Sequence, residues 1–208
     1  MEKQRIILAQ SRFIQEIKKS NFVVNLFPVE SPEEALQILE ETRTEFKDAT
    51  HNVFAWRIGS GGEQQRYSDD GEPSGTAGKP VLNVLERGGY TNLLVVVTRY
   101  YGGIKLGAGG LIRAYAGVVS AALAECRPKY LEKYLYCSLV CSYAEQGHVK
   151  KLFEENEVFL KGTAYDEEVT FHFYILPFSL EKLSIQLRDL SSGKIEVNII
   201  EETERPEF

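Results

Sequence analysis

The chain has 208 residues, of which 43% are hydrophobic and 26% are charged, proportions that are ordinary for a soluble globular protein of one or two domains. The longest purely aliphatic run, LLVVV at 93–97, is far too short to span a membrane, and the amino terminus holds no signal-peptide core, so we expect a cytoplasmic protein. Three cysteines do not suggest a disulfide framework, and Cys137 and Cys141 stand without a second Cys or His pair, so we expect core thiols and no metal.

The net charge of −6 is unevenly distributed along the chain. Residues 133–208 hold 8 Lys or Arg and 14 Asp or Glu, whereas residues 1–132 hold 16 of each kind. Within the neutral part, residues 79–113 contain a single acid, Glu86, and five cations: Lys79, Arg87, Arg99, Lys105 and Arg113. One basic stretch in an otherwise acidic protein is the pattern expected of a local anion site.

The first part of the chain predicts a sheet with one fully buried strand. Residues 11–20 and 21–29 are interpreted as two strands that form a hairpin around Ser20-Asn21. Residues 52–59 predict the next strand. The segment 91–100 predicts a central strand, because its aliphatic run shows no alternation and both of its faces must therefore be buried.

Three helices are predicted in the same part of the chain. The first runs over 31–46, since Ser31 is a cap, Pro32 takes the first helical position and Glu34 completes a capping box. A short second helix over 80–89 ends at a glycine stop.

The longest predicted helix covers residues 111–126. Its apolar stripe recurs at helical spacing and consists of Leu111, Ala114, Tyr115, Val118, Val119 and Ala122. The opposite face carries the small residues Ala116, Gly117, Ser120 and Ala124. Small residues at positions where Lys and Glu are usual suggest that something packs closely against this face.

The polar segment 127–134 is interpreted as the junction between two domains, residues 1–132 and 133–208. Beyond the junction the expected order is β-α-β-β-α-β, the split βαβ arrangement. The expected elements are a strand at 135–142, a helix at about 145–155, strands near 158–165 and 168–176, a helix opened by Ser179, and a strand at 194–201.

Residues 100–115, YYGGIKLGAGGLIRAY, lead from the buried strand into the longest helix through five glycines. Glycines let backbone amides approach a ligand, and a helix start offers unpaired N–H groups with a partial positive charge. Lys105 and Arg113 would add full charges. The same turn would equally serve tight packing alone, and neither GxxxxGK[ST] nor GxGxxG fits the chain.

Residues 68–80, SDDGEPSGTAGKP, show no apolar period. The acids Asp69, Asp70 and Glu72 could hold Mg²⁺ or act as general acid and base, whereas acids beside glycine more often accept backbone N–H bonds. Ser74 does not lie in a GxSxG motif, so it is not a predicted nucleophile. His51 precedes a strand from which it could reach this loop.

Arg99 stands beside Tyr100 and Tyr101 at the end of the buried strand. Arginine with adjacent aromatic rings is suited to single-stranded RNA, where rings stack on bases and guanidinium neutralises phosphate. The same tyrosines would also fit a half-buried strand end.

Together, ATHNVFAW at 49–56, YSDDGEPSGTAGKPVL at 67–82 and VVVTRYYGGIKLGAGGLIRAY at 95–115 resemble the signature of the IMPACT family, specifically its bacterial YigZ-like members. The resemblance covers about the first 130 residues. It implies that the first domain has the α+β fold of the second domain of a small-subunit ribosomal protein and of elongation factor G. It also implies a ferredoxin-like second domain, similar to the last domain of elongation factor G.

Both of those relatives touch ribosomal RNA, so the resemblance implies a translation-linked role by analogy of fold. Eukaryotic members regulate translation under amino-acid starvation and carry an extra amino-terminal domain that contributes to partner binding. Because this chain starts almost directly at the signature segments, we expect that this partner role is not carried over.

We therefore expect an α+β, two-domain protein that binds RNA or the ribosome and modulates translation, without catalysis, cofactor, membrane or DNA partner. The predicted anion or nucleic-acid contacts are Arg99, Tyr100, Lys105, Arg113 and Lys79. The predicted signature-loop residues are His51, Asp69, Asp70, Glu72, Ser74 and Thr76. We expect the loop to lie against residues 99–113, held in register by Asp70 and by Lys79 or Arg113.

Two alternatives stay open. The first is an enzyme acting on a phosphorylated or nucleotide substrate, with phosphate in the glycine-rich turn and Mg²⁺ on the loop acids. The second is a protein-interaction regulator with a protein partner on the small-residue face of the helix over 111–124.

Overall fold

The computed structural model describes residues 4–206 and divides into two compact units, Met1–Leu131 and Glu132–Phe208. Helices and strands are mixed in both units, so the α+β class expected from the sequence is confirmed. No helix within residues 4–206 combines the length and the apolar character that crossing a bilayer requires.

The first unit is built on an antiparallel sheet in the order β2-β3-β6-β4-β5. These strands are β2 (Ser11–Ile17), β3 (Ser20–Pro28), β4 (His51–Ile58), β5 (Gln64–Ser68) and β6 (Leu93–Tyr100). The central strand is β6, and residues 93–99 are buried on both faces of the sheet. The unbroken aliphatic run therefore correctly predicted a central strand.

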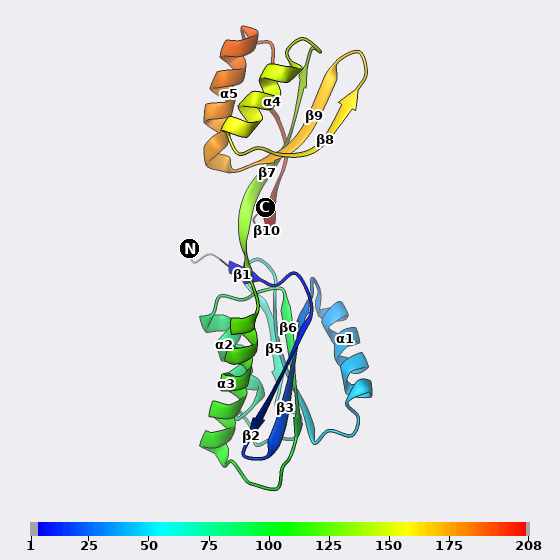
Figure 1. The fold of residues 1–208 in the computed structure, drawn as a ribbon, viewed down its shortest axis with the longest axis vertical. Helices are drawn as coiled ribbons and strands as arrows, with labels where there is room; N and C mark the ends of the chain where they lie inside the picture. Colours follow the sequence, from blue (N-terminus) through cyan, green and yellow to red (C-terminus); the bar gives the residue numbers. More distant parts are fainter. Residues whose placement is uncertain (1–3, 207–208) are drawn as a thin grey trace. The chain divides into compact units, whose positions relative to one another are not determined.

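Helices cover both faces of this sheet, as Figure 1 shows. On one face, α2 (Gly78–Arg87) and α3 (Ala108–Glu125) pack on side chains that include Val95 and Val97. On the other face, α1 (Pro32–Glu45) packs on side chains that include Leu94 and Val96. Adjacent residues of β6 thus serve two different hydrophobic clusters, as the alternation of side chains along a strand requires.

The helix starts follow their predicted signals with two differences. The Ser31 hydroxyl accepts the N–H of Glu34 at 3.2 Å, as a capping box requires, but the Glu34 carboxylate bonds to the N–H of Glu30 at 2.7 Å, one residue before the cap. The longest helix begins at Ala108, earlier than expected, because Gly107 at φ 71° provides the turn into it. All six residues of its predicted apolar stripe are buried.

The hairpin turn and one edge strand differ from expectation. The β2–β3 turn consists of Lys18 and Lys19, both at positive φ, and not of Ser20-Asn21, because Ser20 is fully buried and belongs to the ladder opposite Ile17. The strand β5 was not predicted, since four of its five residues are exposed and it lacks hydrophobic alternation.

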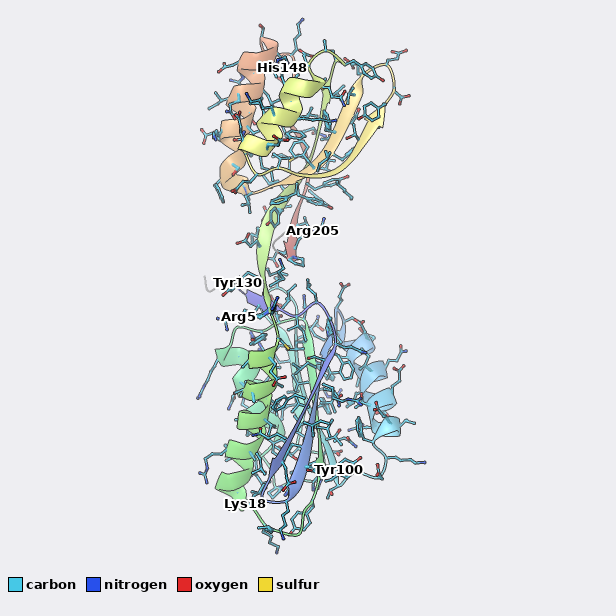
Figure 2. All side chains as sticks on the ribbon, viewed as in Figure 1. Arg5, Lys18, Tyr100, Tyr130, His148 and Arg205 are labelled. Atoms are coloured by element: carbon cyan, nitrogen blue, oxygen red, sulfur yellow. The ribbon has the colours of Figure 1, made fainter. Side chains whose placement is uncertain are left out.

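A short strand, β1 (Gln4–Ile6), closes the first unit at the end opposite this hairpin. It pairs antiparallel with residues 129–131, the first residues of β7 (Lys129–Cys141). The Arg5 guanidinium lies 5.9 Å from the ring centres of Tyr90 and of Tyr130. Figure 2 shows Tyr130 beside Arg5.

The second unit follows the expected order of elements. After β7 come α4 (Gln146–Glu155), β8 (Phe159–Tyr165), β9 (Val169–Ile175), α5 (Pro177–Ser191) and β10 (Asn198–Pro206), with strand order β10-β7-β9-β8. This is the βαββαβ arrangement of a ferredoxin-like domain. The helix α5 begins two residues before the expected Ser179, because Pro177 occupies its first position. The last strand, β10, begins at Asn198 and not at Lys194, because Ile195 is buried in the core before the strand starts.

Candidate functional site

The loop at 68–80 is an ordered structure whose first acid caps a helix. One oxygen of the Asp69 carboxylate accepts the N–H of Gly75 at 2.8 Å. The other accepts the N–H groups of Ala77 and Gly78 at 3.0 and 2.8 Å. These are the first amides of α2, and Ala77 has no side-chain oxygen to satisfy them. Asp69 therefore acts as the N-terminal cap of α2 from outside the helix.

Asp70 fastens the loop to the start of β4. Its backbone adopts φ 44°, and its carboxylate accepts the N–H of Asn52 at 2.6 Å. The Nδ1 of His51 donates to the Asp70 carbonyl at 2.8 Å, so His51 does reach the loop from the strand start. Arg43 lies 3.6 Å from the same carboxylate. The expected partners of Asp70 were wrong, because it is held by β4 and α1.

Glu72 joins the loop to β6 and α3 through a buried cluster. Its Oε1 accepts from Arg99 at 2.6 Å and from the Tyr115 hydroxyl at 2.8 Å, and its Oε2 lies 3.8 Å from His51 Nε2. The side chains of Glu72 and Arg99 are only 3% and 5% exposed. Burial raises the pKa of Tyr115 far above its usual range, and the charge of Glu72 raises it further. The loop thus lies against residues 99–113 through Glu72 and Arg99.

The remaining loop residues have smaller roles. The Thr76 hydroxyl donates to the carbonyl of Pro73 at 2.6 Å, and Ser74 is exposed at the tip of the loop. Lys79 lies 3.9 Å from Glu86 on the next turn of α2. Lys79 and Arg113 were expected to hold the loop, and neither does so.

A pocket of about 390 Å³ opens between this loop, the end of β6 and the start of α3. Glu72 and Arg99 lie in its wall, and Tyr101 and Lys105 are exposed residues at its margin. The Nε of Arg99 is buried and has no hydrogen-bond partner within the described residues. Within the described residues, no side chain caps the backbone amides at the start of α3. The pocket therefore offers N–H donors and the partial positive charge of a helix start.

Exposed cations lie at this end of the first unit, and we call four of them the basic rim: Lys18, Lys19, Lys105 and Arg113. Lys18 and Lys19 come close because the N–H of Gly102 donates to the Ser20 hydroxyl at 3.2 Å. A Cβ on Gly102 would lie 1.8 Å from the Lys19 carbonyl oxygen. Figure 2 shows Lys18 at the same end as Tyr100. Sequence reasoning missed the two hairpin lysines, which only the pairing of β3 with β6 could have revealed.

The two tyrosines after Arg99 have different surroundings. The Tyr100 hydroxyl donates to Asp48 at 3.0 Å, which ties this ring to the turn that follows α1. Tyr101 is 44% exposed, and its ring centre lies 5.5 Å from the Arg99 guanidinium. Tyr101, which is nearer the pocket, is therefore better placed than Tyr100 for stacking on a ligand.

Residues 4–206 hold no group of three or more His, Cys, Asp or Glu that could bind a metal ion. Cys137 and Cys141 are buried in the core of the second unit. Burial raises the pKa of the Cys137 thiol to about 11.

The chain shares both of its domains with known families of sequences. The Impact N-terminal domain matches residues 18–123, and a domain of unknown function, DUF1949, matches residues 139–194. A solved crystal structure of a hypothetical protein is similar with a TM-score of 0.60 and 35% identity, covering 97% of this chain and 98% of the other.

Relatives that align along most of this chain occur in several bacteria. The chain is 35% identical to IMPACT family member YigZ of Escherichia coli (strain K12), with 97% of this chain and 100% of that protein covered. It is 37% identical to IMPACT family member YvyE of Bacillus subtilis (strain 168), with 87% and 83% covered. Protein IMPACT of Homo sapiens is 38% identical over 95 residues, which are 43% of this chain and 29% of the human protein. With both domains matched and relatives aligned along almost their whole length, the chain belongs to the IMPACT family.

Proposed function

We propose that this chain binds RNA, on the ribosome or associated with it, and modulates translation without catalysing a reaction. The observation that carries the proposal is the basic rim beside the uncapped start of α3. Lys18, Lys19, Lys105 and Arg113 are all exposed there, and Tyr101 offers a ring next to them. Phosphate contacts of this kind supply most of the affinity in RNA binding, and exposed rings stack on bases.

The acids of the neighbouring loop do not oppose such a ligand. The carboxylate of Asp69 is surrounded by backbone N–H groups, and that of Asp70 accepts from Asn52. Glu72 is paired with Arg99 inside the protein. The charges of the loop are therefore compensated internally, and the acids that remain exposed beside the rim are those outside the loop, such as Glu16 and Asp48.

Arg99 serves this proposal in a different way from the other predicted cations. Because its charge is compensated by Glu72, it contributes little net attraction for an anion outside the pocket. Its role in the proposal is to hold the loop and Tyr101 in place, while Lys105 and Arg113 make the phosphate contacts. The link to translation is supported by the fold resemblance to domains that touch ribosomal RNA.

A second candidate is an enzyme acting on a phosphorylated or nucleotide substrate. It is favoured by one observation, the carboxylate of Glu72 in the pocket wall with His51 at 3.8 Å. Carboxylate and imidazole are side chains that act as general acid and base, although 3.8 Å is longer than a hydrogen bond between them. In the same proposal the start of α3 would receive the phosphate.

The proposal is tested by co-sedimentation of the purified chain with ribosomes at low and moderate salt. We expect Lys105→Ala with Arg113→Ala to weaken binding and to lower the salt slope of log K by about 1.4, at about 0.7 for each contact to single-stranded RNA. The matched control is Lys150→Ala with Lys151→Ala, two exposed cations of α4. Binding as tight and as salt-sensitive as that of the unchanged chain would reject the rim, and nucleotide binding measured in parallel would favour the enzyme.

A further inference from the structure

The sheet of the second unit has one face packed against helices and another that points away from them. Alternate residues of β7 and β9, such as Cys137, Leu139, Phe171 and Phe173, pack with α4 and α5 in the core. Both helices lie on the same side of this sheet in Figure 1. Because side chains alternate along a strand, Tyr136, Ser138, Thr170, His172 and Tyr174 point to the opposite face.

Three aromatic rings form a cluster on this opposite face, and we call Tyr136, His172 and Tyr174 the ring platform. Tyr136 stands directly across the ladder from Tyr174, and His172 stands across from Ser138. The ring centres of Tyr136 and Tyr174 are 5.0 Å apart, those of Tyr136 and His172 are 6.0 Å apart, and both pairs are tilted by 31°. The rings therefore lie on the two middle strands with similar orientations.

Positive charge accompanies the ring platform. The Nζ of Lys161 lies 4.3 Å from the ring centre of Tyr136, and the Arg205 guanidinium lies 4.1 Å from that of Tyr174. The strands β8 and β9 contain no Asp or Glu, and neither does β7 from Lys133 onward. Apart from Glu132 near the start of β7, the acids in the described part of this unit lie in its helices, the segments that connect its elements, and β10, which pairs with β7.

We propose that the ring platform binds the bases of single-stranded RNA through the half-buried rings of Tyr136 and His172, which the buried Tyr174 supports across the ladder, with Lys161 and Arg205 at the phosphates. A four-stranded sheet that presents aromatic rings stacks two or three bases in this manner, and base stacking tolerates any sequence. The proposal rests on the RNA-binding function above and adds a second contact, in the other unit. A protein partner is less suited to this face, because each of its rings carries a polar atom and Ser138 and Thr170 share the face with the single exposed aliphatic residue of β7, Val140.

The test uses the full chain and a labelled single strand of RNA of about ten nucleotides, without secondary structure, in a fluorescence anisotropy titration. We expect Tyr136→Ala and His172→Ala each to weaken binding by roughly 5- to 100-fold, while the salt slope stays unchanged because no phosphate contact is lost. Tyr136→Phe keeps the ring and should retain most of the affinity. Tyr174 is left in place, since it is only 7% exposed and its removal would disturb the fold.

Two matched controls separate the ring platform from general surface effects. Tyr165 belongs to β8, is 55% exposed and stands across from core residue Val169, so Tyr165→Ala should bind RNA normally. Lys161→Ala should reduce the salt slope by about 0.7, whereas Lys151→Ala on α4 should not change it.

The outcomes distinguish this proposal from the one it rests on. If the ring variants are folded and bind as tightly as the unchanged chain, the ring platform is rejected, even where the rim variants lose ribosome binding. If the unchanged chain does not bind the strand at low salt, the ring platform is also rejected, and ribosome co-sedimentation alone decides the proposed function. Self-association that Tyr136→Ala abolishes, without RNA binding, would make this face an interface between copies and would overturn the proposal.

Discussion

Glu72 and Arg99 lie 27 residues apart in the chain and form an ion pair that is almost withdrawn from water. Removing two charges from water is costly, and their attraction compensates only where further hydrogen bonds satisfy them. Here the Tyr115 hydroxyl donates to Glu72, and Arg99 also donates to the Ser20 hydroxyl at 3.3 Å. At the scale of the residue, these four side chains connect the loop, β6, α3 and the β2–β3 hairpin.

We expect Glu72→Gln to destabilise the first unit by about 3–5 kcal/mol, because it leaves the buried charge of Arg99 without a counter-charge. Guanidinium denaturation followed by fluorescence measures this, since the single tryptophan, Trp56, is buried in the first unit. The control is Glu125→Gln, an exposed carboxyl at the end of α3, which should change the free energy of unfolding by no more than about 0.5 kcal/mol. A loss below about 1 kcal/mol for Glu72→Gln would show that the pair does not hold the loop.

The partners of single residues were the hardest feature to predict. A carboxylate beside glycine was expected to accept backbone N–H groups, and Asp69 does so three times. The sequence did not distinguish Glu72 from Asp70 as the residue that meets the basic segment, because three acids within four positions have similar reach. Only the path of the turn, with Asp70 and Gly71 at positive φ, decides which carboxylate points inward.

At the scale of the element, two glycines differ in whether their surroundings leave space for a side chain. Gly102 follows β6, where the backbone of Lys19 leaves no space for a Cβ. Gly117 lies in the exposed face of α3, where an added Cβ would meet no atom of the described residues within 4 Å. Gly102 is required by a close approach of two chain segments, whereas Gly117 only lowers the stability of its helix.

We therefore expect Gly117→Ala to stabilise the first unit by about 1 kcal/mol, the usual difference in helix propensity. Gly102→Ala should destabilise it by roughly 1–3 kcal/mol or more, because the hairpin must move away. Both changes are measured by the same denaturation of Trp56 fluorescence, and each is the control for the other. Equal effects of the two substitutions would contradict the packing of Lys19 on Gly102.

The prediction of elements succeeded where a pattern recurs along one segment. The stripe of α3 and the aliphatic run of β6 each contain enough repeats to fix the element from local sequence. The edge strand β5 has no such pattern, since a strand exposed on its outer face needs little hydrophobicity. The hairpin turn was misplaced because two lysines at positive φ are unusual, and Ser20 is preferred in turns but is buried here.

At the scale of the whole molecule, each unit has its own hydrophobic clusters. Two clusters lie on the two faces of the first sheet, and a separate cluster centred on Phe171 and Phe173 lies in the second unit. The partners of β1 at 129–131 remain with the first unit if the chain is divided after Leu131.

We expect residues 1–131 and 132–208, expressed separately, each to unfold in a cooperative transition, because each keeps a closed core. Trp56 fluorescence reports on the first fragment and circular dichroism on the second, with the full chain as the reference. A cooperative transition in the full chain but in neither fragment would show that the units depend on each other.

The candidate site was predictable only in the part that is local in sequence. Lys105 and Arg113 were identified because they stand in a run without acids, and both are exposed in the structure. Lys18 and Lys19 join them through a strand pairing over about 80 residues, which no local pattern indicates. The same limit applies to the ring platform, where the register of β7 with β9 brings Tyr136 and Tyr174 together.

The cap that Asp69 places on α2 also governs how the loop exchanges with solvent. The segment 68–80 has the composition of a flexible linker, with three glycines and two prolines. Its amides at Gly75, Ala77 and Gly78 nevertheless donate hydrogen bonds to the Asp69 carboxylate. Their protons would therefore exchange with deuterium only when these hydrogen bonds break. Proteases cut chain that is extended and mobile. We therefore expect residues 75–78 of the loop to resist cleavage as long as the start of α2 stays folded.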